Sequence, residues 1–307
     1  MTSEFDVVKI ASQMFKSQKT DVLSGAGEDD CAVVKIGGKI ILLTTDCVHE
    51  KTDFPPGMLP EEMGHMALAV NLSDIAGSGG RALHFLFNIT LDDATLKDEK
   101  FEGVFKGIKK LADHYDVSVV GGDIDFGDEL YISGFAVGEA ERFVTQSGAK
   151  PGDKICLTGP LGKAQLTLEQ LLSGTDRNET AFPASLYTPQ PKLEEGMELS
   201  SHANAMTDIS DSLAISLNLI AEKSGLGMII KKDSLPLDRL TPYVDEKKAL
   251  KLFLYSGGDF QLVYTSRQCT HGFVIGEVVE GDEKGVILEL EDGKKETVEF
   301  KGYTHFQ

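Results

Sequence analysis

The sequence has few cysteines and none of the cysteine patterns that mark a zinc or redox site. Its 307 residues include four of them, Cys31, Cys47, Cys156 and Cys269. They form no Cys-x-x-Cys pair and do not have the spacing of a zinc site. Each lies among apolar neighbours, which favours a small core residue over a reactive thiol. A serine-nucleophile elbow is also lacking, so cysteine, zinc and serine-hydrolase chemistry are not expected.

Positive charge is also scarce. The chain has 30 Lys and Arg residues against 49 Asp and Glu, which gives a formal net charge of −19. Nucleic acids and anionic membrane surfaces are bound through clustered Lys and Arg, so we expect neither as a partner. The acidic surplus fits a protein that meets anionic substrates through bound cations, although acidic composition also serves solubility alone.

No stretch of the sequence is long and apolar enough to span a membrane. The N-terminal residues Met1-Thr2-Ser3-Glu4-Phe5 have neither the basic segment nor the apolar segment of a secretion signal. We therefore expect a cytoplasmic protein in a reducing compartment.

Two glycine-rich stretches resemble nucleotide-binding loops but fail their spacing rules. The segment Gly159-Pro160-Leu161-Gly162-Lys163 lacks the Gly-x-x-x-x-Gly-Lys-Ser/Thr order of a Walker A loop. Gly25 and Gly27 do not begin a dinucleotide-binding motif, because Asp30 occupies the third glycine position. Nucleotide binding by either of these two routes is excluded.

What the sequence does contain is an alternation of helix and strand patterns. In the first part of the chain it predicts helices over 5–18, 59–77 and 94–115 and strands over 39–43, 83–90, 117–120 and 130–138. After a connector at 139–153 it predicts strands over 154–157, 260–265, 273–279 and 286–290, helices after 163 and over 213–225, and a polar loop over 173–184. We therefore predict an α/β protein of the α+β type with two domains, residues 1–140 and 141–307.

Acidic residues recur at the predicted ends of these apolar elements, beside glycine, serine or threonine. The first group, Glu28-Asp29-Asp30, stands at the entrance of an apolar strand, and the others are Asp46, Asp74, Asp123, Asp208, Asp211 and Asp259. One such acidic end is more often solvated than metal-bound. The repetition of the pattern favours acids that converge on bound cations, because clustered carboxylates otherwise repel one another.

Two of these positions are unusual for a helix end. Asp74 is predicted near the C-terminal end of its helix, where the dipole disfavours an anion unless a cation faces it or the end is open to solvent. Asp208, Ser210 and Asp211 precede another helix, which needs only one N-cap residue. Two of those three side chains are therefore free to bind a ligand.

Hard oxygen ligands of this kind are those that Mg²⁺ prefers. Several Mg²⁺ ions can hold a polyphosphate, and positioning and charge neutralisation then supply most of the catalysis. The residues alone thus predict an enzyme of magnesium-dependent phosphoryl transfer.

Taken in order, the motifs resemble those of the thiamine-monophosphate kinase family, which belongs to the aminoimidazole-ribonucleotide-synthetase-like ATP enzymes. They extend over almost the whole chain and are Gly-Glu-Asp-Asp-Cys-Ala-Val (27–33), Thr-Thr-Asp (44–46), Val-Asn-Leu-Ser-Asp-Ile-Ala (70–76), Gly-Gly-Asp (121–123), Ser-Gly-Ala-Lys-Pro-Gly-Asp (147–153), Asp-Ile-Ser-Asp (208–211) and Gly-Gly-Asp-Phe (257–260). The resemblance implies transfer of the γ-phosphate of ATP to thiamine monophosphate. It also implies a homodimer formed by the sheet of the N-terminal domain, with the C-terminal domain covering the site.

The resemblance also assigns roles to individual residues. The implied Mg²⁺ ligands are Asp30, Thr44, Thr45, Asp46, Asp74, Asp123, Asp208 and Asp211, of which Asp208 and Asp211 are also the implied catalytic pair. The implied ATP-binding residues are Gly122, Asp123, Gln146 and Ser210. Substrate contacts are implied for Asp53, which lies in a Pro-Pro-Gly loop at 51–60, for Asp259, and for Tyr303, whose ring would meet the thiamine rings.

This chain departs from the family pattern at four places. The family often has His where this chain has Asp53, and Arg where it has Gln146. A glycine is usual at the position of Ser212, and the glutamate of a longer Gly-Gly-Glu-Asp turn is replaced by Asp259. The departure at Asp53 concerns the loop at 51–60 and hence the acceptor. The departure at Gln146 concerns the contact with the nucleotide phosphates.

Three alternatives remain at this level. A related dehydratase of hydrogenase maturation carries a C-terminal cysteine, whereas this sequence ends His305-Phe306-Gln307. Selenophosphate synthetase needs a reactive residue near the N-terminus, and no cysteine precedes Cys31. The third alternative is an ATP-binding relative without catalysis.

Overall fold

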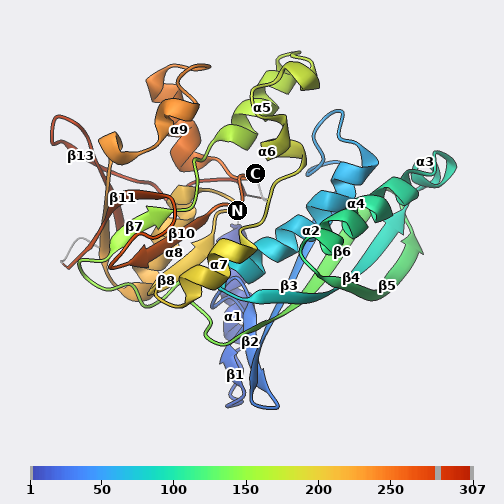
Figure 1. The fold of residues 1–307 in the computed structure, drawn as a ribbon, viewed down its shortest axis with the longest axis horizontal. Coiled ribbons are helices and arrows are strands. Elements are labelled where there is room, and N and C mark those ends of the chain that lie inside the picture. The colour runs from blue at the N-terminus through green and yellow to red at the C-terminus, as the bar shows by residue number, and fades with distance from the viewer. Residues whose placement is uncertain (1–2, 281–284, 305–307) are drawn as a thin grey trace.

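The computed structural model describes residues 3–280 and 285–304, and within them the chain forms two β-sheets with packed helices (Figure 1). The first sheet has the strand order β1-β2-β3-β6-β4-β5, and the second has the order β13-β12-β9-β11-β7-β10-β8. His305, Phe306 and Gln307 lie outside the described residues. The predicted α/β fold class with a two-part layout is confirmed.

The first sheet is covered by helices on one face. Its strands are β1 (Val22–Ser24), β2 (Ala32–Ile36), β3 (Lys39–His49), β4 (Arg81–Leu91), β5 (Ser118–Phe126) and β6 (Tyr131–Ala140). Neighbouring strands are antiparallel except for the parallel pair β4 and β5. The covering helices are α2 (Pro60–Gly77), α4 (Lys100–His114) and the short α3 (Asp93–Lys97). Alternate residues such as Phe85 and Ile89 are buried beneath them, as the period of a strand requires.

Helix α2 is the central element of the molecule. It packs against the first sheet, α4, α7 (Leu193–Ser200) and β8 (Ala205–Asp208) of the second half. A helix enclosed in this way must be apolar on all sides, and Leu68, Leu72 and Ile75 are fully buried. α4 approaches so closely that a Cβ added at Gly64 would lie 1.9 Å from the Val104 carbonyl oxygen. The C-terminal end of α2 thereby reaches the boundary between the two halves.

The second sheet forms most of the C-terminal half. Its strands are β7 (Lys154–Leu157), β8, β9 (Gly227–Lys231), β10 (Leu262–Ser266), β11 (Phe273–Val279), β12 (Gly285–Glu289) and β13 (Lys295–Thr297). The helices of this half are α5 (Lys163–Leu172), α6 (Pro183–Tyr187), α7, α8 (Leu213–Ser224) and α9 (Glu246–Tyr255). Leu213, Leu217 and Ile220 of α8 are fully buried and fill the second core. No helix in the described part of the chain is long and apolar enough to cross a membrane.

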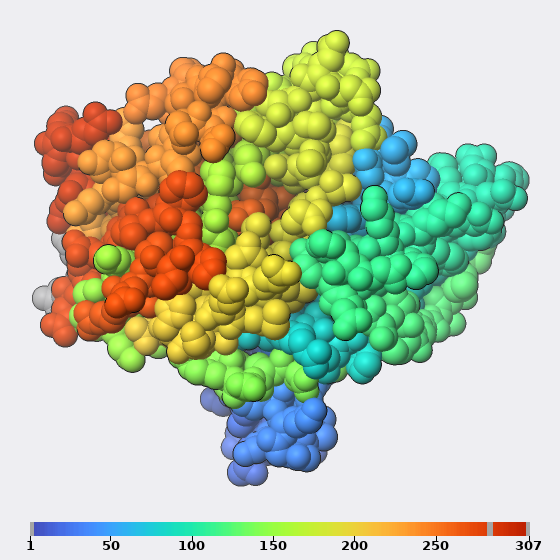
Figure 2. Space-filling model, in the orientation of Figure 1, coloured from blue at the N-terminus to red at the C-terminus, as the bar shows by residue number. Residues whose placement is uncertain are grey.

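Two parts of the first half leave apolar side chains uncovered. Every residue of the edge strand β5 is exposed, including Val120, Ile124 and Phe126. Helix α1 (Glu4–Met14), which corresponds to the helix predicted over 5–18, has no buried residue. β1 and β2 project from the body of the molecule in the blue lobe (Figure 2), and Phe5 of α1 packs edge-on against Phe300. Clustered exposed apolar side chains of this kind are typical of interaction surfaces.

Several predicted boundaries were wrong. The helix predicted over 94–115 is broken into α3 and α4 at Glu99, which has a positive φ of 54°. β3 continues beyond Asp46 to His49, and β5 continues beyond Asp123 to Phe126. Both acids therefore lie within strands instead of at their ends, because an acid on an exposed strand position does not stop the ladder.

Candidate active site

Four acids from separate elements gather where the two halves meet. Asp30 precedes β2, Asp46 lies on β3, Asp74 is in the last turn of α2 and Asp208 ends β8. The neighbouring carboxylates of Asp208, Asp46 and Asp30 all act on Asp74, which places the four in one group. The sequence prediction that these acids converge agrees with this arrangement.

Hydroxyl and amide groups hold these carboxylates in place. Thr44 Oγ1 donates a short hydrogen bond to Asp74 Oδ2, and Ser73 Oγ donates to Asp208 Oδ2 at 2.5 Å. The backbone N–H of Asp46 donates to Asn71 Oδ1 at 3.1 Å. Because Asn71, Ser73 and Asp74 share the last turns of α2, this one helix orients most of the group.

The group is unfavourable for negative charge in the absence of a cation. Burial raises the pKa of Asp74 well above its ordinary value, and the carboxylates of Asp208, Asp46 and Asp30 raise that pKa further. Burial followed by the charge of Asp30 likewise raises the pKa of Asp208 well above its ordinary value. The pKa of Asp30 is also raised, chiefly by burial.

The donor set fits a hard cation. Within residues 3–280 and 285–304, Asp30 Oδ2 is buried and has no hydrogen-bond partner, and a Cβ added at Gly77 would lie 2.6 Å from this oxygen. Glycine at the end of α2 therefore leaves room beside a bare carboxylate oxygen. Over residues 3–280 and 285–304 no three His, Cys, Asp or Glu side chains form a ready-made metal site. Carboxylate and hydroxyl oxygens are nevertheless the ligands that Mg²⁺ prefers.

Thr45 does not join this group through its side chain. Successive residues of a strand point to opposite faces, and Thr44 points towards α2. Thr45 therefore points to the open face of the sheet, where its Oγ1 donates to the Gly134 carbonyl oxygen at 2.9 Å. Thr45 stays a predicted Mg²⁺ ligand, and with its side chain on the open face it would contribute its backbone carbonyl.

Gly122 and Asp123 lie away from the acids of their own chain. Register partners on the neighbouring strands β3, β6, β4 and β5 are, in order, Asp46, Gly134, Phe87 and Gly122. Gly122 therefore lies three strand spacings, or about 14 Å, from Asp46. Asp123 belongs to the next row, with Cys47, and so points to the open face of the sheet. One chain alone does not bring Asp123 to the acids.

A second group of predicted residues does come together. The backbone N–H of Tyr303 donates to the Asp211 carbonyl oxygen at 3.3 Å. Burial raises the pKa of Tyr303, and the charges of Asp53 and Asp211 raise it further, which places both acids near the ring. Ser212 caps α8 by accepting from the Ile215 N–H at 3.0 Å, and its Oγ donates to the Lys301 carbonyl oxygen at 2.8 Å.

Ser212 therefore corrects one prediction and explains one departure. None of Asp208, Ser210 and Asp211 caps α8, because the following serine does so. The same hydroxyl anchors the C-terminal segment two residues before Tyr303. Serine in place of the usual glycine thus has a structural use next to the site, and the exposed Ser210 side chain is left available for a ligand.

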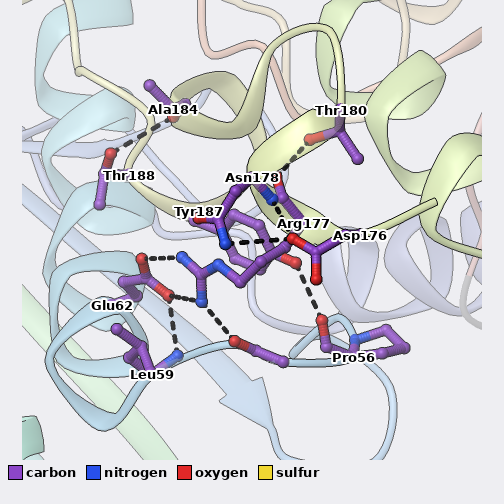
Figure 3. A network of polar contacts seen from close by, with 11 residues as sticks. Pro56, Leu59, Glu62, Asp176, Arg177, Asn178, Thr180, Ala184, Tyr187 and Thr188 are labelled. Atoms are coloured by element: carbon purple, nitrogen blue, oxygen red, sulfur yellow. Dashed lines mark hydrogen bonds and ion pairs between the residues drawn. The ribbon is translucent and has the colours of Figure 1, made fainter.

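The loop that carries Asp53 is fastened to the C-terminal half (Figure 3). Arg177 pairs with Glu62 through both nitrogens, at 2.6 and 3.2 Å, and also donates to the Gly57 carbonyl oxygen. Its guanidinium lies 4.1 Å from the centre of the Tyr187 ring, and Tyr187 donates to the Pro56 carbonyl oxygen at 2.9 Å. The loop is therefore held by side chains that lie more than 100 residues away in the sequence.

The Asp259 carboxylate contacts the start of helix α5. Its buried carboxylate accepts from the backbone N–H groups of Gly162, Lys163 and Ala164, at 2.5, 3.2 and 3.1 Å. These groups begin α5, so Asp259 satisfies a helix N-terminus. The structure thus gives this carboxylate a structural role, and the substrate contact that the resemblance implies for Asp259 stays a prediction.

Several residues that the structure places at these sites had no function predicted from the sequence. Ser73 and Thr207 contact Asp208 and Asp30, and Lys223 of α8 reaches Gln146 beside them. Phe105 of α4 lines a pocket of about 610 Å³ between α4 and β5. Only Ser73 was within a recognised motif, since the others depend on packing between distant segments.

Comparison with known proteins agrees with this geometry. Residues 28–140 match the family described as AIR synthase related protein, N-terminal domain. A thiamine-monophosphate kinase of Archaeoglobus fulgidus is 49% identical over 303 residues, which cover 99% of this chain and 98% of the relative. The chain belongs to the thiamine-monophosphate kinase family. The Escherichia coli member is 31% identical and covers 99% of this chain and 98% of its own length.

Solved structures give the same result. AaThiL complexed with AMPPCP and TMP has a TM-score of 0.86 and 32% identity, covering 99% of this chain and 97% of its own. The hydrogenase maturation protein HypE in complex with ATP has a TM-score of 0.71 at 19% identity, covering 94% of this chain and 92% of its own. The second likeness concerns the fold alone, so family membership lies with the kinases and not with the dehydratase alternative.

Proposed function

We propose that this protein transfers the γ-phosphate of ATP to thiamine monophosphate, giving thiamine diphosphate and ADP. The observation that carries the proposal is the convergence of Asp30, Asp46, Asp74 and Asp208 at the boundary of the two halves. The names of the relatives support it, as does the related structure complexed with AMPPCP, an ATP analogue, and TMP. We also expect it to act in the cytoplasm.

Mg²⁺ is the metal that we propose for the acids. When bound, Mg²⁺ neutralises the charge of the phosphate oxygens and of the developing transition state. Asp30, Asp74 and Asp208 would hold it, with Thr44 Oγ1 and Asp46 beside them. The phosphates of ATP therefore bind here in spite of the net charge of −19.

The acceptor would bind at the neighbouring group formed by Asp53, Asp211 and Tyr303. Thiamine monophosphate has a cationic thiazolium ring, which an aromatic face and carboxylates both attract. Asp211 links the two groups, since it follows Asp208 by three residues and contacts the segment of Tyr303. We propose that it positions the acceptor phosphate against the donor.

The direct test is an assay of both products. Incubation with ATP, Mg²⁺ and thiamine monophosphate should yield thiamine diphosphate and ADP in equal amounts, and EDTA should abolish turnover. Phosphorylation of free thiamine without that of the monophosphate would reject the assigned acceptor. ATP binding without any ADP formation would favour the alternative of a non-catalytic relative.

We further propose two domains, residues 1–140 and 141–307. β6 ends at Ala140 and β7 begins at Lys154, and the family match also ends at residue 140. On this division Asp30, Asp46 and Asp74 belong to the first domain and Asp208 to the second. The site would then depend on how the two domains pack against each other.

We also propose a homodimer in which each chain completes the site of its partner. The exposed apolar residues of β5 and of the open face of the sheet support association, and include Val119, Val120, Ile124, Phe126, Leu43 and Phe135. Gly122 and Asp123 lie on this surface, next to the pocket lined by Phe87 and Phe105. Its volume of about 610 Å³ suits a nucleotide base.

A mixed dimer tests this arrangement. Asp74→Asn and Asp123→Asn subunits, each expected to be inactive alone, are co-expressed with different tags and purified through both. If Asp123 acts on the partner's acids, one site of each mixed dimer is intact and roughly half of the wild-type activity returns. An inactive mixed dimer would place Asp123 in its own chain's site, and a 33.3 kDa particle in light scattering would exclude the dimer.

A further inference from the structure

A lysine from the second half reaches the acids. Lys223 is near the C-terminal end of α8, and its side chain is half-buried. Its Nζ lies 2.5 Å from Gln146 Oε1 and 2.7 Å from the Glu28 carbonyl oxygen. The ammonium is therefore next to the acidic segment 28–30 although it is almost 200 residues away in the sequence.

This contact fixes the orientation of the Gln146 amide. An ammonium group can only donate hydrogen bonds, so the amide oxygen must face Lys223 and the amide nitrogen must face the other way. Gln146 Nε2 accordingly donates to Asp30 Oδ1 at 2.6 Å. Without the ammonium, the amide can turn over and present its oxygen to Asp30, where two acceptors would repel each other.

The result is a carboxylate with two distinct oxygens. Asp30 Oδ1 accepts from Gln146 Nε2 and also from Thr207 Oγ1, the second at 2.7 Å. Asp30 Oδ2 is buried, lies beside Gly77 and has no hydrogen-bond partner among the residues that the structure describes. One oxygen is thus saturated by protein donors while the other is kept bare at the candidate metal site.

We propose that Lys223 is a positioning residue that acts through Gln146 to hold the Asp30 carboxylate with Oδ2 available for the cation. The family pattern has an arginine where this chain has Gln146, so the positive charge of that arginine is supplied here from α8. The inference rests on the proposed use of Mg²⁺. It concerns the metal affinity of the site, which can be measured without turnover.

The test uses Mn²⁺ as a spectroscopic substitute for Mg²⁺. Binding is followed by electron paramagnetic resonance without nucleotide, in the wild type, Lys223→Met, Gln146→Met and the double variant. Loss of a residue that orients a metal ligand weakens metal binding by roughly tenfold to a hundredfold. We expect the affinity for Mn²⁺ to fall about tenfold in each single variant. The double variant should lose no more, because both changes break the same chain of contacts from Lys223 through Gln146 to Asp30.

Two further variants complete the experiment. Lys223→Arg keeps a cation that can only donate, so it should bind Mn²⁺ within about threefold of the wild type. Lys232→Met removes a lysine that is paired with Glu246 and Glu291 and does not contact the site; it is the matched control and should bind Mn²⁺ normally. Lys223→Arg and Gln146→Met keep the test informative if Lys223→Met does not fold.

Three results would overturn the inference. Normal Mn²⁺ binding by a folded Lys223→Met protein would exclude a positioning role. Losses that multiply in the double variant would mean that Lys223 acts on the metal site independently of Gln146. A wild type that binds no Mn²⁺ would reject the proposed metal itself, which distinguishes that failure from the first two.

Discussion

At the scale of single residues, similar sequence motifs have different roles in this molecule. Asp74 and Asp259 both stand beside glycine or serine at the end of an apolar element. The Asp259 carboxylate accepts hydrogen bonds from three N–H groups at the start of α5, whereas Asp74 stands at the C-terminal end of α2 beside other acids. A carboxylate at a helix N-terminus is stabilised by the dipole, and one at the C-terminus is disfavoured. The position of Asp74 thus indicates a functional demand that Asp259 does not have.

The Asp74→Asn variant tests this demand. We expect kcat to fall by about 10² to 10³, the effect of losing one preorganised electrostatic group. The metal-free variant should be as stable as the wild type or more stable, because the change removes repulsion from Asp208, Asp46 and Asp30. Turnover at saturating Mg²⁺ and melting temperature in EDTA measure the two effects.

Asp292→Asn is the matched control, since Asp292 is an exposed acid paired with Lys294 in the turn between β12 and β13. It should leave turnover unchanged. Near wild-type turnover of Asp74→Asn would remove Asp74 from the site and would contradict the convergence of the acids on one metal centre.

At the scale of elements, the beginning of α2 is tied to both the acceptor loop and the second half. Glu62 accepts from the Leu59 N–H at 2.8 Å and so closes the first turn of α2. The same carboxylate pairs with Arg177, which also holds Gly57 and covers Tyr187. Both charged side chains are largely shielded from solvent, so the pair is stronger than an ordinary surface pair. One arginine thereby orders the loop that carries Asp53.

Arg177→Met should loosen this loop without reaching the acids. We expect the KM for thiamine monophosphate to rise by about fivefold, which corresponds to about 1 kcal/mol of lost ordering. The KM for ATP should change little, and proteolysis within residues 51–58 should become faster. Steady-state kinetics and limited proteolysis check the two effects.

Arg239→Met, at an exposed position of the second half, is the control and should behave as the wild type. Equal increases in both KM values for Arg177→Met would instead indicate a general loss of packing between the two halves.

At the scale of the whole molecule, acidic residues are both abundant and concentrated. The net charge is −19, and the raised pKa values of Asp29, Asp30, Asp74 and Asp208 all belong to one region. Burial, followed by the charge of Asp30, raises the pKa of Asp29 to about 8. The folded protein without metal therefore disfavours the ionised form of these four carboxyl groups.

The stability of the metal-free protein should consequently fall as the pH rises. Between the unfolded pKa of Asp29, 3.8, and its folded pKa of about 8, the native state binds protons that the unfolded state releases. The free energy of unfolding therefore decreases with pH in this range. Mg²⁺ binds the ionised carboxylates, so it should stabilise the protein more at pH 8 than at pH 5.

Melting temperatures at pH 5, 6, 7 and 8, in EDTA and in excess Mg²⁺, measure both trends. Asp74→Asn should show a shallower decrease in EDTA, because it removes one of the groups that the fold keeps protonated. A melting temperature in EDTA that rises steadily from pH 5 to pH 8 would contradict the expectation.

The sequence by itself determined the family, the fold class and the gathering of the acids. These follow from local signals, such as the apolar period of α2 and the short motifs around Asp30, Asp74 and Asp208, which remain at element ends in the fold. Tertiary structure alone decided the tasks of other residues. Asp259 accepts hydrogen bonds at the N-terminus of α5, Asp123 lies on the open face of β5, and Lys223 donates to Gln146. The physical reason is that a polar side chain takes its role from its partners, and packing brings those partners from distant segments.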